Sequence, residues 1–185
     1  LELPFILAPV GSSRMFYPNG DVLAARAAGK AGTGYVLSTL SGTPMEQVRA
    51  ATSGPAWYQV YLCGGREASV NMLNRAKAAG FTALVVTIDT GVPGLRERDL
   101  RNGIKELLGR SVSGLPFLGQ MIVRPGWIAG MLMDGGLMEF PNVLLPTGPM
   151  PYADVGKTLE QSVVCWDDLK WIRELWNGKI VVKGV

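Results

Sequence analysis

Short apolar runs alternate with turn residues and helical segments along the first half of the chain. Four such runs lie at Phe5 to Pro9, Tyr35 to Leu37, Trp57 to Tyr61 and Leu84 to Thr87. Each run is continuous and is bounded by turn residues, which is typical of a parallel strand that is buried on both faces. Alanine-rich segments fill the intervals between the runs. The pattern therefore predicts a series of βα units.

The ends of two helices carry local signals. Thr43 can cap a helix that has Pro44 at its first position, and Glu46, three residues after the cap, completes a capping box. Gly32 and Gly80 each follow alanines and precede a strand, where glycine readily adopts the left-handed conformation that ends a helix. We therefore expect a helix to begin at Thr43 and two others to end at these glycines.

A long segment from Gly91 to roughly Val164 interrupts the series. It is rich in Gly, Pro, Met and Leu and is too long for an ordinary connection. We interpret residues 91–164 as a functional insertion, a lid or a small subdomain within one domain that spans residues 1–185. The series then resumes with a helix from about Asp167 to Trp176 and a fifth strand from Lys179 to Lys183.

Apolar parallel strands belong either to an open doubly wound sheet or to a barrel. No Gly-x-Gly-x-x-Gly follows the first strand, and Gly11-Ser12-Ser13-Arg14 does not continue as a P-loop, which disfavours the nucleotide-binding sheets. The chain is also shorter than the roughly 250 residues of a whole (β/α)₈ barrel. We therefore predict an α/β fold, a partial (β/α)₈ TIM barrel of about the first five strands with the insertion after the fourth.

The amino-acid composition limits the kinds of binding and catalysis that the chain can perform. The formal charge is +3 and the basic residues are interspersed with acidic ones, so nucleic acid is not indicated. The two cysteines, Cys63 and Cys165, suggest neither a disulfide framework nor a metal site. No targeting signal or long apolar run is visible, which favours a cytoplasmic location. The chain has no histidine, so its chemistry must use other groups or borrow one.

Polar side chains cluster where the expected strands end, and in barrels the carboxyl ends of the strands carry the site. The candidates are Val10, Gly11, Ser38, Gln59, Tyr61, Thr87 and Lys183. Small hydroxyls, an amide and one ammonium beside an apolar wall suit the edge of a planar polar heterocycle, such as an isoalloxazine.

Each candidate also has a purely structural interpretation. Ser38 and Thr87 can cap turns, and Lys183 can extend into solvent beyond the strand end. Gln59 lies in an apolar strand and needs a buried hydrogen-bond partner, which either a ligand or a structural network can supply. Arg96 has charged neighbours and, on local evidence, is a solvated loop residue.

Six blocks of the sequence resemble the FMN-dependent α-hydroxy-acid dehydrogenases and oxidases, the family of glycolate oxidase, L-lactate dehydrogenase and mandelate dehydrogenase. The blocks are Ile6-Leu7-Ala8-Pro9-Val10-Gly11, Leu37-Ser38-Thr39, Tyr58-Gln59-Val60-Tyr61, Thr87-Ile88-Asp89-Thr90, Arg96-Glu97-Arg98-Asp99 with Arg101-Asn102-Gly103, and Val182-Lys183-Gly184-Val185. Their order and spacing agree with the family over essentially the whole chain.

The resemblance implies a role for every candidate. FMN would be the cofactor, with the backbone of Val10 and Gly11 against the flavin. The side chains that would bind the isoalloxazine edge are those of Ser38, Gln59, Thr87 and Lys183. Tyr61 and Arg96 would bind a small 2-hydroxy acid, with the arginine on its carboxylate.

The resemblance also implies what the chain lacks. The family's general base is a histidine that would follow the next strand beyond Val185, so we expect no catalytic base within these residues. The chain is therefore interpreted as a fragment that is inactive by itself and binds FMN weakly. Its activity would be that of a longer parent enzyme, which is expected to form a homo-oligomer.

Two positions bear on the subtype. Gly11 stands where oxidases of the family usually have alanine, which favours a dehydrogenase that passes electrons to a quinone or a protein over one that uses O₂. Leu40 replaces a tryptophan of glycolate oxidase, so the hydroxy acid cannot be named.

The segment from Arg124 to Leu132 resembles the region of lactate and mandelate dehydrogenases that can contact a membrane. This segment has two alternative interpretations. It either attaches the protein peripherally to the inner face of the membrane or packs over the barrel as a lid.

Two alternatives remain at this point. A flavoenzyme of the same fold could oxidise an amine or a modified peptide, and Leu40 permits such a change in the substrate wall. A non-catalytic half-barrel scaffold is the other, and it would have to cover its open sheet edge.

Overall fold

A computed structural model describes residues 1–91, 97–102, 119, 122–136 and 138–185. Its main sheet has five parallel strands in the order β1-β2-β3-β4-β7. These strands are β1 (Ile6–Leu7), β2 (Gly34–Leu37), β3 (Ala56–Val60), β4 (Ala83–Thr87) and β7 (Lys179–Lys183). The order in the sheet follows the order in the chain, as around a barrel wall, whereas a doubly wound sheet reverses at a switch point. The fold is the predicted partial (β/α)₈ barrel.

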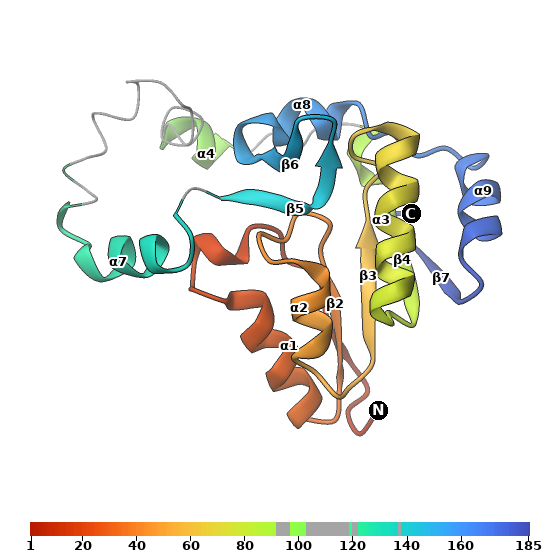
Figure 1. The fold of residues 1–185 in the computed structure, drawn as a ribbon, viewed down its shortest axis with the longest axis horizontal. Coiled ribbons are helices and arrows are strands. Elements are labelled where there is room, and N and C mark those ends of the chain that lie inside the picture. The colour runs from red at the N-terminus through yellow and green to blue at the C-terminus, as the bar shows by residue number, and fades with distance from the viewer. Residues whose placement is uncertain (92–96, 103–118, 120–121, 137) are drawn as a thin grey trace.

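One face of this sheet is covered by the helices that link its strands (Figure 1). They are α1 (Gly20–Lys30), α2 (Met45–Ala50), α3 (Gly65–Ala79) and α9 (Asp168–Leu175). Their buried apolar residues join those of the strands in one core cluster. Burial of this layer is the main source of stability, because about 25 cal/mol is gained for each Å² of apolar surface removed from water.

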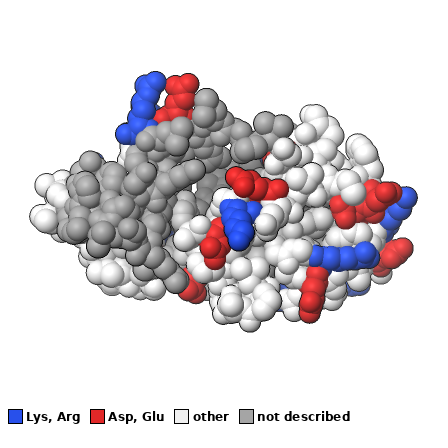
Figure 2. Space-filling view, turned by 90° about the horizontal axis from the view of Figure 1, so that it is seen from above, with Lys and Arg blue, Asp and Glu red and all other residues white. Residues whose placement is uncertain are grey.

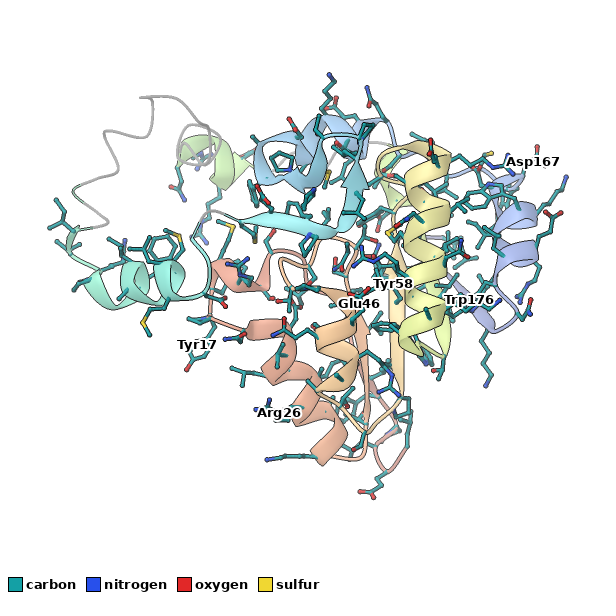
Figure 3. The ribbon with its side chains drawn as sticks, viewed as in Figure 1. Tyr17, Arg26, Glu46, Tyr58, Asp167 and Trp176 are labelled. Atoms are coloured by element: carbon teal, nitrogen blue, oxygen red, sulfur yellow. The ribbon has the colours of Figure 1, made fainter. Side chains whose placement is uncertain are left out.

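The alternation of side chains along the strands places the candidate residues on the opposite face. Tyr58 and Leu84 belong to the core beneath the helices, and Figure 3 shows Tyr58 beside Glu46 of α2. Gln59 pairs in register with Val85, and Thr87 pairs with Lys183. Because neighbours along a strand point to opposite faces, Gln59, Thr87 and Lys183 lie on the inner face of the barrel wall.

The strand predictions are confirmed except in the first strand. The run from Phe5 to Pro9 was expected to be a buried strand, yet only Ile6 and Leu7 pair, and Phe5 is 53% exposed. In the described sheet β1 pairs with β2 on one side only. An edge position explains both the short pairing and the exposure.

The capping box expected at Thr43 is wrong. Helix α2 begins at Met45, and the Met45 N–H donates to Asn142 Oδ1 at 2.8 Å. Glu46 is bound by Arg75 at 3.0 Å and so does not close a box. A cap from a residue this distant in sequence leaves no local signal. Gly32 and Gly80 have φ of +66° and +89°, as expected for residues that end helices.

The segment between β4 and α9 supplies described elements that lie over the carboxyl end of the sheet, towards which β3 points in Figure 1, except α7, which lies to one side. Its elements are η2 (Asp89–Gly91), α4 (Glu97–Arg101), α7 (Pro125–Met133), the antiparallel pair β5 (Glu139–Leu145) and β6 (Gly148–Pro151), η4 (Tyr152–Asp154) and α8 (Val155–Glu160). Phe140, Val143 and Met150 of the β5–β6 pair belong to the same core cluster as the helix layer. The pair is therefore continuous with the barrel's own core.

Candidate functional site

Ser38, Gln59 and Thr87 are joined by hydrogen bonds at the ends of three adjacent strands. Ser38 Oγ donates to Gln59 Oε1 at 3.2 Å, and Gln59 Nε2 donates to Thr87 Oγ1 at 3.0 Å. All three side chains are buried. We call this trio the floor of the site. Sequence analysis had identified each member separately, and the structure brings them together.

Thr39 holds the floor in place through hydrogen bonds, a role that was not predicted from the sequence. Its hydroxyl donates to the backbone oxygen of Gln59 at 2.5 Å and accepts from the Tyr61 N–H at 3.0 Å. Its own N–H donates to Gln59 Oε1 at 3.2 Å. The loop after β2 is thereby fixed along the end of β3. Nothing in the sequence distinguished this threonine from an ordinary turn residue.

Counting donors and acceptors shows which bonds the floor can still make. Gln59 Oε1 already accepts two hydrogen bonds, whereas its Nε2 has a second N–H. The Thr87 hydroxyl accepts from Gln59, which leaves its proton for another acceptor. Ser38 donates to Gln59 and accepts from the Leu40 N–H at 3.1 Å, so it keeps one acceptor position. The floor therefore has two donors to offer, and Thr87 and Ser38 each keep one acceptor position.

A half-exposed rim lies beyond the floor. Lys183 Nζ donates to Asp89 Oδ2 at 2.9 Å, with the two side chains 45% and 41% exposed. Tyr61 Oη lies 3.5 Å from Asp89 Oδ1. Asp89 thus links Tyr61 and Lys183, two predicted site residues outside the floor. Asp89 belongs to the block Thr87-Ile88-Asp89-Thr90 but was assigned no role from the sequence. Its position two residues after Thr87 is nevertheless a usable signal.

Gly184 permits this close arrangement. It has a φ of +97°, and a Cβ at this position would lie 2.9 Å from the Cβ of Asp89. The backbone continues the β4–β7 ladder here, since the Ile88 N–H donates to the Lys183 oxygen at 2.9 Å. A residue without a side chain after Lys183 therefore lets Asp89 approach the ammonium group.

Val10 and Gly11 lie in the loop after β1, beside the loop after β2. The Ser12 N–H donates to the Leu40 oxygen at 2.8 Å, and Val10 is exposed. A Cβ at Gly11 would meet the Cβ of Leu40 at 3.4 Å, an ordinary contact, so the position has room for alanine. Its glycine is not required by the packing of the described residues.

Arg96 lies outside the described residues. Within the described part of the chain, no group of histidine, cysteine or acidic side chains could hold a metal ion, and no helix is long and apolar enough to cross a membrane. Cys63 is buried and Cys165 exposed, both unpaired. Seen from above, as in Figure 2, Lys and Arg lie among Asp and Glu over the described surface.

Comparison with known proteins identifies relatives along the entire chain. The profile of the FMN-dependent dehydrogenase family matches residues 1–185. The L-lactate dehydrogenase of Stenotrophomonas maltophilia (strain K279a) is 40% identical over 190 residues, covering 100% of this chain and 49% of that protein. The L-lactate dehydrogenase of Pseudomonas aeruginosa (strain UCBPP-PA14) is 39% identical over 190 residues with the same coverage. The chain thus spans about half the length of these curated relatives.

Solved structures agree with the sequence relatives. The crystal structure of (S)-mandelate dehydrogenase, described as a monotopic membrane protein, superposes with a TM-score of 0.84 at 31% identity, over 99% of this chain and 48% of that one. A mandelate oxidase variant with (S)-mandelic acid gives a TM-score of 0.67 at 27% identity, over 99% of this chain and 42% of that one.

Proposed function

This chain belongs to the FMN-dependent dehydrogenase family, and from that premise we propose that the whole protein uses FMN to oxidise a small L-2-hydroxy acid to the 2-oxo acid. Its similarity to L-lactate dehydrogenases and to mandelate dehydrogenase supports this substrate class. The observation that carries the proposal is the hydrogen-bonded floor of Ser38, Gln59 and Thr87 next to the ammonium of Lys183.

The donor set of the floor fits the polar edge of an isoalloxazine. That edge presents carbonyl oxygens and ring nitrogens as acceptors and one N–H as a donor. Gln59 and Thr87 have one free donor each, and Ser38 has one free acceptor position. Val85 and Val181, on the same inner face, supply apolar wall. We assign FMN to this position, with the backbone of Val10 and Gly11 on its other side.

Lys183 is proposed to supply the positive charge for the reaction. Bound FMN would supply the acceptor for the two electrons that leave the substrate carbon, and a cation beside its ring would offset the negative charge of the reduced form. The Lys183 ammonium has donors beyond the one that Asp89 uses, and its charge stabilises such a developing anion. Asp89 holds Nζ at a fixed point, which removes much of the flexibility of the lysine side chain.

Substrate binding is assigned to Tyr61 and Arg96. Tyr61 lies on the rim, where its hydroxyl faces Asp89 and can also meet a carboxylate or hydroxyl of a small acid. Arg96 would clamp the carboxylate with paired donors. The chain contains no histidine, and we place the proton acceptor in the part of the relatives that this chain does not cover.

We favour a dehydrogenase over an oxidase and propose a quinone or a protein as the electron acceptor. Gly11 supports this choice through the resemblance described above. The packing around Gly11 accepts alanine, so the described contacts do not require glycine at this position.

A membrane surface is the proposed partner of α7. Met133 is 88% exposed, and the neighbouring Leu132, Ile122 and Val123 are exposed as well. Exposed apolar residues on a short helix suit insertion into the headgroup region, since no described helix can span a bilayer. The similarity to (S)-mandelate dehydrogenase, a monotopic membrane protein, supports this assignment. Binding of the whole protein to vesicles should fall when Leu132 and Met133 are both changed to Ser, and unchanged binding would contradict it.

Anaerobic flavin reduction by the whole protein tests the main proposal. The FMN-loaded protein is mixed with lactate, glycolate, mandelate or a primary amine, and loss of flavin absorbance is followed. Rapid bleaching by a hydroxy acid, with formation of the matching 2-oxo acid, is expected. Bleaching by the amine alone would replace the proposed substrate class, and bleaching by none together with failure to bind FMN would favour a scaffold.

A further inference from the structure

The loop between β1 and α1 is held from two sides by carboxylates. It contains Val10 and Gly11, and it includes two non-glycine residues in the left-handed conformation, Ser12 and Asn19, with φ of 59° and 54°. Such a conformation costs on the order of 1 kcal/mol or more per residue and persists only when surrounding contacts enforce it. The contacts that do so come from Asp21 and Asp134.

Asp21 is fully buried and holds the loop to the sheet. Its carboxylate accepts hydrogen bonds from Ser13 Oγ at 2.5 Å, Ser41 Oγ at 2.7 Å and Tyr35 Oη at 2.7 Å. Burial, followed by the charge and hydrogen bond of Asp21, raises the pKa of the Tyr35 phenol, so this group remains a donor. One carboxylate therefore ties the loop after β1 to β2 and to the loop after β2.

Asp134, immediately after α7, holds the same loop from the insertion. Its carboxylate accepts from Arg14 Nε and from the Asn19 N–H, each at 3.0 Å, and its backbone oxygen accepts from another Arg14 nitrogen. Arg14 also donates to the Gly42 oxygen at 3.1 Å. The Arg14 and Asp134 side chains are 15% and 14% exposed, which protects their ion pair from solvent screening.

The adjacent residues Ser13 and Arg14 are thus bound by different carboxylates, and Asn19 is bound at the loop's far end. Trp127 of α7 adds a third link, donating from Nε1 to the Met15 oxygen at 2.8 Å. Figure 3 shows Tyr17, from the middle of this loop, between α1 and α7. The insertion, although distant in sequence, therefore forms part of the support of the residues that face the site.

We propose that Asp21 and Asp134 are positioning residues, a pair of carboxylates that clamps the loop from Val10 to Asn19 so that Val10 and Gly11 are presented to the flavin. This inference rests on the proposed function, since it assigns the clamp a role in FMN binding. Neither carboxylate contacts the floor or the rim among the described contacts. Their effect is exerted through the loop backbone.

The test uses the whole protein with Asp134→Asn, which keeps the size of the side chain and removes its charge. Backbone hydrogen exchange of residues 10–19 is measured in the FMN-free protein, and the FMN dissociation constant is measured by fluorescence titration. We expect faster exchange in this loop and an FMN dissociation constant raised about tenfold, as befits loss of charge-assisted hydrogen bonds. Should this variant not fold, Ser13→Ala loosens the Asp21 side of the clamp, with a smaller rise of about threefold.

Two controls separate positioning from general stability. Glu139→Gln removes an exposed carboxylate of the same insertion and should change neither quantity. Ile172→Val, in the core under α9, should lower the unfolding temperature without faster exchange in residues 10–19. An Asp134→Asn protein that matches wild type in loop exchange or in FMN affinity would overturn the clamp. A wild-type protein that fails to bind FMN would instead refute the proposed function, and the clamp's role in binding with it.

Discussion

Asn142 Oδ1, in the β5–β6 pair, accepts a hydrogen bond from the backbone N–H of Met45, the first residue of α2, and Asn142 Nδ2 donates to the Thr43 oxygen at 3.0 Å. One buried amide therefore caps a helix of the barrel from within the insertion. The Met45 N–H has no other described side-chain partner, whereas the Thr43 oxygen also accepts from Ser41 Oγ at 3.1 Å.

Removing this amide should destabilise the fold. Asn142→Ala leaves the Met45 N–H without its acceptor in a buried place and removes one of the two side-chain donors to the Thr43 oxygen, and we expect the free energy of unfolding to fall by about 1–3 kcal/mol. Asn142→Asp keeps the acceptor and loses the donor, so its denaturation midpoint in urea should lie between those of Asn142→Ala and wild type. Equal midpoints for Asn142→Ala and wild type would show that the cap contributes nothing.

Gln59→Leu tests the floor of the site. It removes the acceptor of Ser38 Oγ and the Thr39 N–H and the donor to Thr87, so unfolding should be easier by about 1–3 kcal/mol and FMN binding weaker. Gln47→Leu, at an exposed position of α2, is the matched control and should stay within about 0.5 kcal/mol of wild type. The network is not needed if urea denaturation and FMN titration give the same values for the two variants.

Gly184→Ala should disturb the rim. The new Cβ would lie 2.9 Å from the Cβ of Asp89, and φ of +97° disfavours any side chain, so a loss of more than about 1 kcal/mol is expected. Gly156→Ala in α8, where a Cβ meets nothing within 4 Å, should be neutral or stabilising. Thermal unfolding of the two variants compares them directly, and an unchanged Gly184→Ala protein would show that Asp89 moves away at no cost.

The two cysteines should differ sharply in reactivity. Burial raises the pKa of the Cys63 thiol to about 12, although a hydrogen bond with Ser162 opposes the rise. Cys165 is exposed. Because the thiolate is the reacting form, a brief treatment with iodoacetamide at pH 8 should modify Cys165 and spare Cys63, as measured by peptide mass spectrometry. Modification of both at equal rates in the folded protein would contradict the burial of Cys63.

Glu46 should contribute to acid sensitivity. Burial by itself raises the pKa of this carboxyl, but hydrogen bonds and charge from Arg75 outweigh it, and the pKa is lowered overall. A lowered pKa means that the carboxylate stabilises the fold above its unfolded pKa and that this contribution is lost as the pH falls through the folded value. Glu46→Gln should therefore reduce stability at pH 7 slightly, and less below pH 4. The difference is measured by denaturation at both pH values, and a constant difference would exclude the linkage.

The sheet could be predicted from sequence because its signals are local. Each strand after the first is a continuous apolar run, and Gly80 ends α3 with the positive φ that its position after Ala79 predicts. The length and the burial of the first strand were overestimated, because a sequence does not show that a strand lies at a sheet edge. Helix α2 was predicted to have Pro44 at its first position, one residue before its observed start at Met45, since its cap comes from Asn142.

The candidate site was predicted in part for the same reason. Residues at the carboxyl ends of neighbouring strands, such as Ser38, Gln59 and Thr87, share a face by strand alternation, so their proximity follows from the pattern. Asp89 and Thr39 were given no role, because their contacts depend on how two loops are laid against each other. The role of Asp134 could not be predicted from the neighbouring sequence, since its partners Arg14 and Asn19 come from the start of the chain.

The pairing of β7 with β4 means that the sheet is completed only after residues 88–178 have been folded back. The entropy lost on closing a flexible connection grows only with the logarithm of its length, about 0.6 kcal/mol for each doubling. A connection of this size therefore weakens the fifth strand very little at equilibrium. Its main effect is kinetic, because distant contacts form slowly, so β7 and the Lys183 that it carries should be among the last parts of the described site to assemble.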